Sequence, residues 1–235
     1  MPSTYPSTGF SIATVQTQAT NDEITLYTEI RLASLLNDPD SFGSVYKDEI
    51  VHSRSKFSNR INTPGRTTIF ASLDSGQDLE EEEQGLLQVL PDTLVPADSR
   101  RLSPWLGTIT ALAPSLLRGP WEQTYPSKVT EALEQSDIEV WALVGMWVRP
   151  EHRGKGIGTA LAQRALEEVK RLADSSKAAV KIDRLVLLEV YEHNFGAIKL
   201  YERAGFQMFV YPSNVDDPGK RRWMAYKILA AELST

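Results

Sequence analysis

The sequence predicts one α/β domain with a mixed central sheet flanked by helices. Residues 140–148 form an almost unbroken apolar run, apolar on both alternating faces, which is typical of a strand buried on both sides. A glycine-rich turn follows, and from Ile157 onward apolar residues recur at helical spacing. Residues 184–191 form another apolar strand after this helical crossover, so we expect the two strands to be parallel.

The other elements follow from the same patterns of apolar spacing, caps and breakers. Residues 1–9 are rich in Ser, Thr and Pro and are typical of a flexible tail, so the domain is expected to span 10–235. The further expected elements are an edge strand over 10–18, a helix from Asn21 to the break at 38–40, an amphipathic stretch over 45–61, strands over 66–73 and 105–112, a short helix over 127–134, a helix over 194–204, and final strands over 206–211 and 222–229, joined by a turn at 216–219.

Two long stretches between strands interrupt this alternation. Residues 74–101 contain a run of acidic side chains and two prolines, with few bulky residues before Leu86, which favours a mobile acidic insertion. Residues 114–137 form a second long loop that directly precedes the central strand. Because long loops in compact domains are often functional, this loop is a candidate to shape a substrate pocket.

Composition limits the possible chemistry and partners. The chain of 235 residues has no cysteine, which excludes disulfides, thiolate catalysis and cysteine-ligated metals. Its three histidines lie far apart, so no metal site is expected. The net charge of −6 argues against nucleic-acid binding, and no apolar run is long enough for a membrane span. The start of the chain lacks signal-peptide blocks. We therefore expect a cytoplasmic or nuclear protein, as a monomer or homodimer.

The turn between the central strand and the next helix has the features of a phosphate site. Glycines allow positive φ and close approach of a ligand, and a helix start offers unpaired N–H groups. A dinucleotide fingerprint would need a third glycine where Thr159 stands, and the P-loop sequence is absent. What remains is R-x-x-G-x-G, formed by Arg153, Gly156 and Gly158, or a glycine-rich turn with solvated charges.

This R-x-x-G-x-G turn closely resembles the pyrophosphate loop of the GCN5-related N-acetyltransferase (GNAT) family. A second GNAT-like motif, N-x-x-A-x-x-x-Y-x-x-x-G-F, is filled by Asn194, Ala197, Tyr201, Gly205 and Phe206. The resemblance extends from about residue 105 to 229 and does not cover the acidic insertion.

The resemblance implies that acetyl-CoA binds in a slot between the two parallel strands, which splay apart at their C-terminal ends. The pantetheine arm would pair with the central strand and the pyrophosphate would lie on the glycine turn. The residues that the resemblance implies for acetyl-CoA binding are Met146, Trp147, Val148, Arg153, Gly154, Lys155, Gly156, Ile157, Gly158, Thr159, Asn194, Ala197 and Tyr201. For Trp147, packing in the core is the competing interpretation.

The resemblance also implies direct transfer of acetyl to a primary amine in a ternary complex. Tyr201 would protonate the departing thiolate, although a packed core tyrosine has the same pattern. Glu189 is the candidate base, since it interrupts an apolar strand, and its alternative role is a structural hydrogen bond. Glu139 and His193 are weaker candidates. The acceptor stays open among small amines, polyamines and protein amines, and a non-catalytic CoA sensor is the alternative function.

Overall fold

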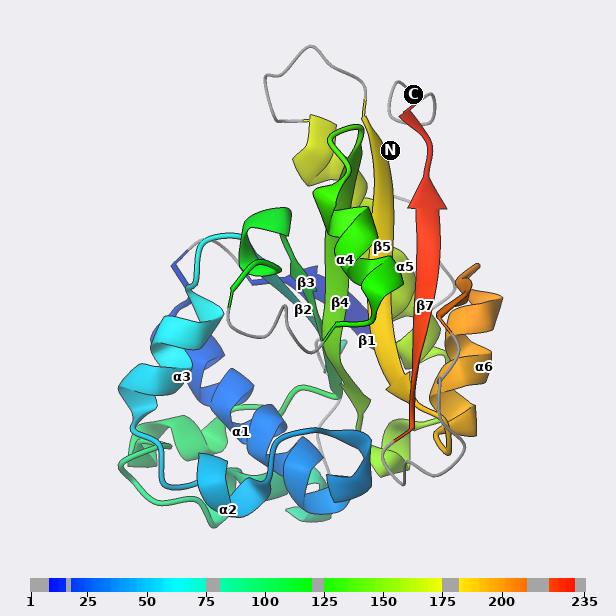
Figure 1. Cartoon of the computed structure of the whole chain (residues 1–235). Helices are drawn as coiled ribbons and strands as arrows, with labels where there is room; N and C mark the ends of the chain where they lie inside the picture. Colours follow the sequence, from blue (N-terminus) through cyan, green and yellow to red (C-terminus); the bar gives the residue numbers. More distant parts are fainter. Residues whose placement is uncertain are drawn as a thin grey trace, which may run out of the picture. The chain divides into compact units, whose positions relative to one another are not determined.

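The computed structural model describes residues 9–15, 18–74, 81–119, 125–174, 182–210 and 220–230. Its strands form a seven-stranded sheet in the order β1-β2-β3-β4-β5-β7-β6 (Figure 1). β4 and β5 run parallel, whereas β1–β2, β5–β7 and β6–β7 are antiparallel pairs. The predicted mixed sheet with flanking helices is therefore confirmed. The strands are β1 (Phe10–Thr14), β2 (Arg66–Leu73), β3 (Gly107–Leu112), β4 (Ile138–Val148), β5 (Asp183–Tyr191), β6 (Gln207–Val210) and β7 (Arg221–Ile228).

The helices lie close to their predicted positions. They are α1 (Asn21–Asn37), α2 (Tyr46–Glu49), α3 (Arg54–Ile61), α4 (Ser127–Glu134), α5 (Ile157–Asp174) and α6 (Phe195–Arg203). The amphipathic stretch over 45–61 is two helices rather than one, because the chain turns at 50–53 between α2 and α3. Short 3-10 segments include η2 (Glu81–Gln88), η3 (Ala97–Arg101) and η6 (Pro150–His152). The predicted turn at 216–219 lies outside the described residues.

The chain divides into two compact units. The first consists of Met1–Pro64, Thr68–Ile109 and Gly145–Leu161, and the second of Gly65–Thr67, Thr110–Val144 and Ala162–Thr235. Several elements, β4 and α5 among them, contribute residues to both units.

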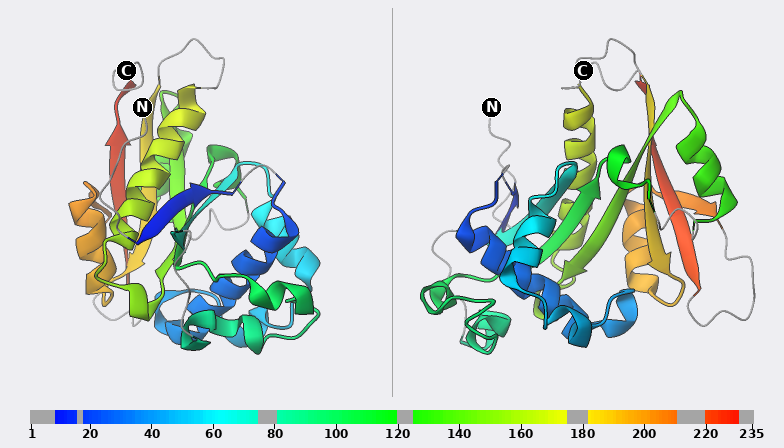
Figure 2. Two further views of the ribbon diagram at one scale, coloured as in Figure 1. Left: turned by 180° about the vertical axis from the view of Figure 1, so that it is seen from behind. Right: turned by 60° about the vertical axis from the view of Figure 1, so that its left-hand side comes forward.

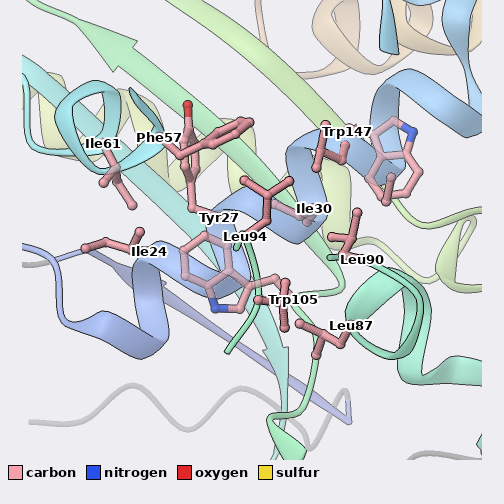
Figure 3. Close-up of a cluster of buried hydrophobic side chains, with 13 residues drawn as sticks. Ile24, Tyr27, Ile30, Phe57, Ile61, Leu87, Leu90, Leu94, Trp105 and Trp147 are labelled. Carbon is pink, nitrogen blue, oxygen red and sulfur yellow. The ribbon is translucent and has the colours of Figure 1, made fainter. Parts of the chain in front are cut away.

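The first unit is built around one face of α1. The helix starts with a capping box, in which the Thr20 side chain accepts from the Glu23 N–H and Glu23 accepts from the Thr20 N–H. Ile24, Tyr27 and Ile30 of α1 pack in one cluster with Phe57 of α3, as Figure 3 shows. The cluster also contains Trp105, which precedes β3, and Trp147 near the end of β4. Trp105 is 2% exposed, and its ring stacks on Phe70 at 4.2 Å between centroids. Figure 2 shows α1, α2 and α3 gathered with the segment from Glu81 to Arg101.

Part of the predicted mobile insertion packs into this core. Leu87, Leu90, Leu94 and Val95 are buried in the cluster around α1. The Arg100 guanidinium donates to the carbonyl oxygens of Leu87 and Leu90 at 2.6 and 2.9 Å. The overall acidity of 74–101 concealed these apolar anchors, which are concentrated after Gly85. The mobility of 74–101 stays a prediction. The buried leucines make its second half the part that is held in place.

The second unit has its own core between α4 and the sheet. Val129, Ala132 and Leu133 of α4 pack with Val140 and Ala142 of β4 and with other buried residues of the unit, and α4 lies over β4 and β5 in Figure 1. The second predicted loop, 114–137, thus contains the expected short helix, and this helix buries one face. At the edge of this core, the rings of Tyr125 and Trp223 meet edge to face at 5.5 Å.

Candidate active site

The glycine turn joins η6 to α5 in the first unit. Gly154 and Gly156 have φ of +77° and +87°, a backbone conformation that favours glycine. A Cβ built on either glycine would meet no described atom within 4 Å, so the backbone conformation and not crowding requires glycine there. The first helical bond runs from the Ala160 N–H to the Gly156 carbonyl at 3.0 Å. The preceding N–H groups at the start of this long helix can therefore point at an anion.

The two cations of the turn are placed differently. Arg153 donates through Nε to the Val148 carbonyl at 3.0 Å and through Nη2 to Asp38 Oδ2 at 2.5 Å. Lys155 is exposed, with Nζ 3.4 Å from Nδ1 of His152. Arg153 is thus anchored in place rather than a freely moving charge, and Asp38 holds it from the end of α1.

The central strand changes character halfway along its length. Its parallel pairing with β5 is recorded from Ile138↔Asp183 to Leu143↔Leu188, while both strands continue beyond these residues. Val144 is 37% exposed, and Gly145 is exposed with φ of +66°. The prediction of a strand buried on both sides is therefore wrong at these two positions. A positive φ thus interrupts the regular strand next to the point where the recorded pairing with β5 stops.

Tyr201 lies in the second unit on the buried face of α6. Asn194 caps this helix, its side chain accepting from the Ala197 N–H at 3.1 Å, and Gly205 ends it with φ of +95°. The Tyr201 ring meets Phe206 at 5.8 Å between centroids. Burial raises the pKa of the Tyr201 phenol well above its ordinary value. The hydroxyl therefore stays protonated near neutral pH.

Glu189 lies beyond the last recorded β4–β5 pair and is exposed, not buried in the apolar strand as its neighbours suggested. Its Oε2 accepts from Nη1 of Arg221 at 3.0 Å. Sequence reasoning treated the carboxylate as costly because it expected burial, and the alternation of β5 places it outward instead. Its role as a base stays a prediction, now with an identified partner.

The weaker candidates have clear structural surroundings. Glu139 accepts from Arg184 Nε at 2.8 Å and from Trp141 Nε1 at 3.0 Å, which is the arrangement of a structural carboxylate. His193 is exposed and its ring stacks on Tyr191 at 5.5 Å. Trp147 is 5% exposed and donates through Nε1 to Asp38 at 2.6 Å, so its side chain packs in the first unit.

The other predicted binding residues fall into the same two groups. Met146, Val148, Ile157, Gly158 and Thr159 belong to the first unit with the glycine turn, and Asn194, Ala197 and Tyr201 belong to the second. Of these, Ile157 and Gly158 are buried, whereas Met146, Val148, Thr159, Asn194 and Ala197 are half-buried.

Three residues of the site were missed from the sequence. Asp38 was taken only as a helix breaker, and Arg221 lay just before the predicted last strand, 222–229, with no role assigned. Gly145 carried a usable signal, because glycine inside a strand often marks a bulge or a close backbone approach. Asp38 and Arg221 carried none, since their partners are distant in sequence.

Known proteins share this segment and this fold. Residues 129–206 match the model of the Acetyltransferase (GNAT) family. NAA60 from Arabidopsis thaliana, solved with acetyl-CoA, superposes with a TM-score of 0.51 at 15% identity, covering 93% of this chain and 98% of that chain. The chain has the GNAT fold, and residues 129–206 match the GNAT family model.

Two further known proteins are similar to this chain. Spermidine N-acetyltransferase from Vibrio cholerae, solved with CoA and spermine, has a TM-score of 0.50 at 12% identity, covering 97% of this chain and 100% of that one. An uncharacterised N-acetyltransferase of Methanocaldococcus jannaschii is 39% identical over 69 residues, which are 29% of this chain. The match spans 26% of that relative, so it informs on the segment and not on the whole protein.

Within the described ranges, no three His, Asp or Glu side chains are grouped in a way that could hold a metal ion. None of the described helices combines the length and the apolar character that a membrane crossing requires.

Proposed function

We propose that this GNAT protein is an N-acetyltransferase that transfers acetyl from acetyl-CoA to a primary amine by direct attack in a ternary complex. The observation that carries the proposal is the glycine turn, whose two left-handed glycines lead into the start of α5. Such a turn presents backbone N–H groups to phosphate oxygens, and the GNAT motif on α6 supplies the tyrosine that the reaction needs.

The proposed binding mode uses the change in β4. The pyrophosphate lies on residues 153–159, and the amide-bearing pantetheine arm pairs with the backbone of residues 146–148 as an added strand. The positive φ of Gly145 supports this pairing, because it interrupts the regular strand directly before residues 146–148. A backbone N–H near Val148 then donates to the thioester oxygen in the transition state.

The proposed chemistry moves two protons. The amine nitrogen attacks the thioester carbon, forming an N–C bond, and the C–S bond breaks. Glu189 takes a proton from the amine, directly or through water, and the Tyr201 hydroxyl gives a proton to the departing thiolate. A tyrosine hydroxyl carries its proton at neutral pH, as this second role requires.

The first test is binding. Gly156→Val forces a branched side chain onto a left-handed backbone position, so we expect CoA affinity measured by calorimetry to fall at least tenfold while the fold persists by circular dichroism. Unchanged affinity in a folded variant would remove the turn from the site.

The second test is chemical. Tyr201→Phe removes one hydroxyl, and kcat should fall on the order of ten- to a thousandfold with CoA affinity unchanged. Tyr226→Phe is the matched control, because Tyr226 also packs against Phe206, at 5.6 Å between centroids, and should keep kcat. The acceptors to screen are spermidine, free amino acids and short peptides with free N-termini, with detection of released CoA. Tight CoA binding without transfer to any amine in a broad screen would instead favour the sensor function.

A further inference from the structure

One guanidinium makes three contacts at the C-terminal end of β5. Arg221 on β7 donates through Nη1 to Glu189 Oε2 at 3.0 Å and through Nη2 to the Tyr191 hydroxyl at 3.1 Å. Its Cζ also lies 4.9 Å from the centre of the Tyr191 ring. Tyr191 stands directly opposite Arg221 in the β5–β7 register, and Glu189 lies two residues before it on the same face.

The neighbouring arginine provides a natural comparison. Arg222 also pairs with a glutamate, donating through Nη2 to Glu192 at 2.6 Å. Because neighbouring residues of a strand point to opposite faces, Arg221 and Arg222 serve different sides of the sheet. Neighbouring residues of β7 therefore make two similar ion pairs on opposite faces of the sheet, and the pair of Arg221 is with Glu189.

We propose that Arg221 is a positioning residue that fixes the Glu189 carboxylate for proton transfer, a role that rests on the proposed acetyltransferase function. A glutamate side chain has several rotatable bonds, and an exposed one samples many positions. The bond to Arg221 occupies Oε2 and leaves Oε1 to face the amine or a bridging water. Tyr191 in turn orients the guanidinium through its hydroxyl and its ring. The proton lost by the amine passes to Glu189 and then to solvent, while Arg221 remains charged throughout.

Positioning predicts a specific pattern of kinetic effects. A group held in place for proton transfer affects the chemical step, so Arg221→Ala should lower kcat on the order of ten- to a hundredfold with the KM for acetyl-CoA unchanged. Arg221→Lys should recover part of this loss, because it keeps the charge without the two-pronged geometry. Arg222→Ala should keep kcat within about twofold of the wild type.

The decisive experiment is a double-mutant cycle with chemical rescue, using the best acceptor among spermidine, free amino acids and short peptides with free N-termini. If Arg221 acts only through Glu189, Arg221→Ala should have no further effect on kcat in the Glu189→Gln background. Millimolar guanidinium chloride should raise the kcat of Arg221→Ala several-fold, with no rescue of Arg222→Ala or of the double variant.

Each other outcome overturns the proposal. Equal losses from Arg221→Ala in both backgrounds would mean that Arg221 acts independently of Glu189. A loss confined to acceptors with a free carboxylate, seen in KM, would make Arg221 a substrate contact. An unaffected kcat in Arg221→Ala would mean that the Arg221–Glu189 pair is only a structural salt bridge between β7 and β5. A wild type that binds CoA but acetylates no acceptor would instead refute the proposed function itself.

Discussion

Glu29 in the first unit and Glu189 in the second each pair with one arginine, but their surroundings differ sharply. The side chain of Glu29 is 0% exposed and that of Arg149 is 5% exposed. Nη2 of Arg149 lies 2.5 Å from Oε2 of Glu29. Glu189 and Arg221 are 35% and 43% exposed. The other oxygen of Glu29 accepts from the Leu86 N–H at 2.9 Å, so both of its oxygens are occupied.

The difference separates a folding role from a chemical one. A buried carboxylate with both oxygens occupied cannot take a proton from a substrate, and removing it would leave Arg149 buried without its counter-charge. An exposed pair contributes little to stability, about 0–1 kcal/mol, yet keeps an oxygen within reach of solvent and ligand. Burial thus excludes Glu29 and leaves Glu189 open to the proposed role in proton transfer.

The largest expected effect is on the buried pair. Glu29→Gln should lower the free energy of unfolding by about 3–5 kcal/mol, because it leaves a buried charge uncompensated. Glu189→Gln, the same chemical change at the exposed pair, should cost no more than about 1 kcal/mol. Urea unfolding of both variants measures the contrast, and equal losses would mean that burial does not distinguish the pairs.

Hydrogen exchange sharpens this prediction within the acidic segment. The Leu86 amide is bonded to Glu29, and the leucines that follow are buried, so amides over 85–95 should exchange slowly in the wild type. In Glu29→Gln the Leu86 amide should exchange faster, whereas amides of α4 should change little. Fast amide exchange over 85–95 in the wild type would mean that the whole insertion, 74–101, is mobile as the sequence predicts.

A third glutamate lies between the two extremes and tests the pH dependence. Burial alone would raise the pKa of Glu49, but hydrogen bonds and charges from Arg31 and Arg60 outweigh it and lower the pKa from 4.5 to about 2. Because the folded pKa is the lower one, this stabilisation is fully present above pH 4.5 and is lost as the pH falls from 4.5 toward 2. The loss should amount to about 2–3 kcal/mol.

Unfolding at a series of pH values measures this loss. Glu49→Gln should be less stable than the wild type near neutral pH and should have a shallower decline below about pH 4.5. A Glu49→Gln protein with the full wild-type pH dependence would show that other groups control acid unfolding.

The smallest expected effect concerns Asp38 and Arg153, whose side chains are 25% and 46% exposed. Asp38→Asn removes the charge that neutralises Arg153 beside the glycine turn. CoA should then bind a few-fold more tightly at low salt, a gain of about 1 kcal/mol or less that fades as salt increases. Asp40→Asn, an exposed neighbour, should change affinity less, and S-acetylpantetheine, which lacks the pyrophosphate, should bind both variants like the wild type. Weaker CoA binding in Asp38→Asn would mean that orienting Arg153 matters more than freeing its charge.

Much of the architecture could be predicted because its signals are local. The bounds of β2 and α4 matched, since turn residues and side-chain periodicity mark them within a few positions. Asn194 and Gly205 marked the two ends of α6 in the sequence. A helix start needs a capping side chain, and the left-handed residue after a helix end is usually glycine. The glycine turn was recognisable for the same reason.

By itself, the sequence determined the order of elements, the glycine turn and the GNAT motif on α6, because each depends on residues close together in the chain. It also determined the parallel β4–β5 pair, because two strands joined by a helical crossover run parallel. Only the tertiary structure decided which charges meet. Arg153 and Asp38 are 115 residues apart, and Arg221 and Glu189 are 32 apart. Likewise, the average composition of 74–101 is acidic and predicted an exposed loop. In the structure, a few buried leucines anchor its second half in the core around α1. Contacts between distant residues depend on how the strands are ordered and in register, which no short stretch of sequence encodes.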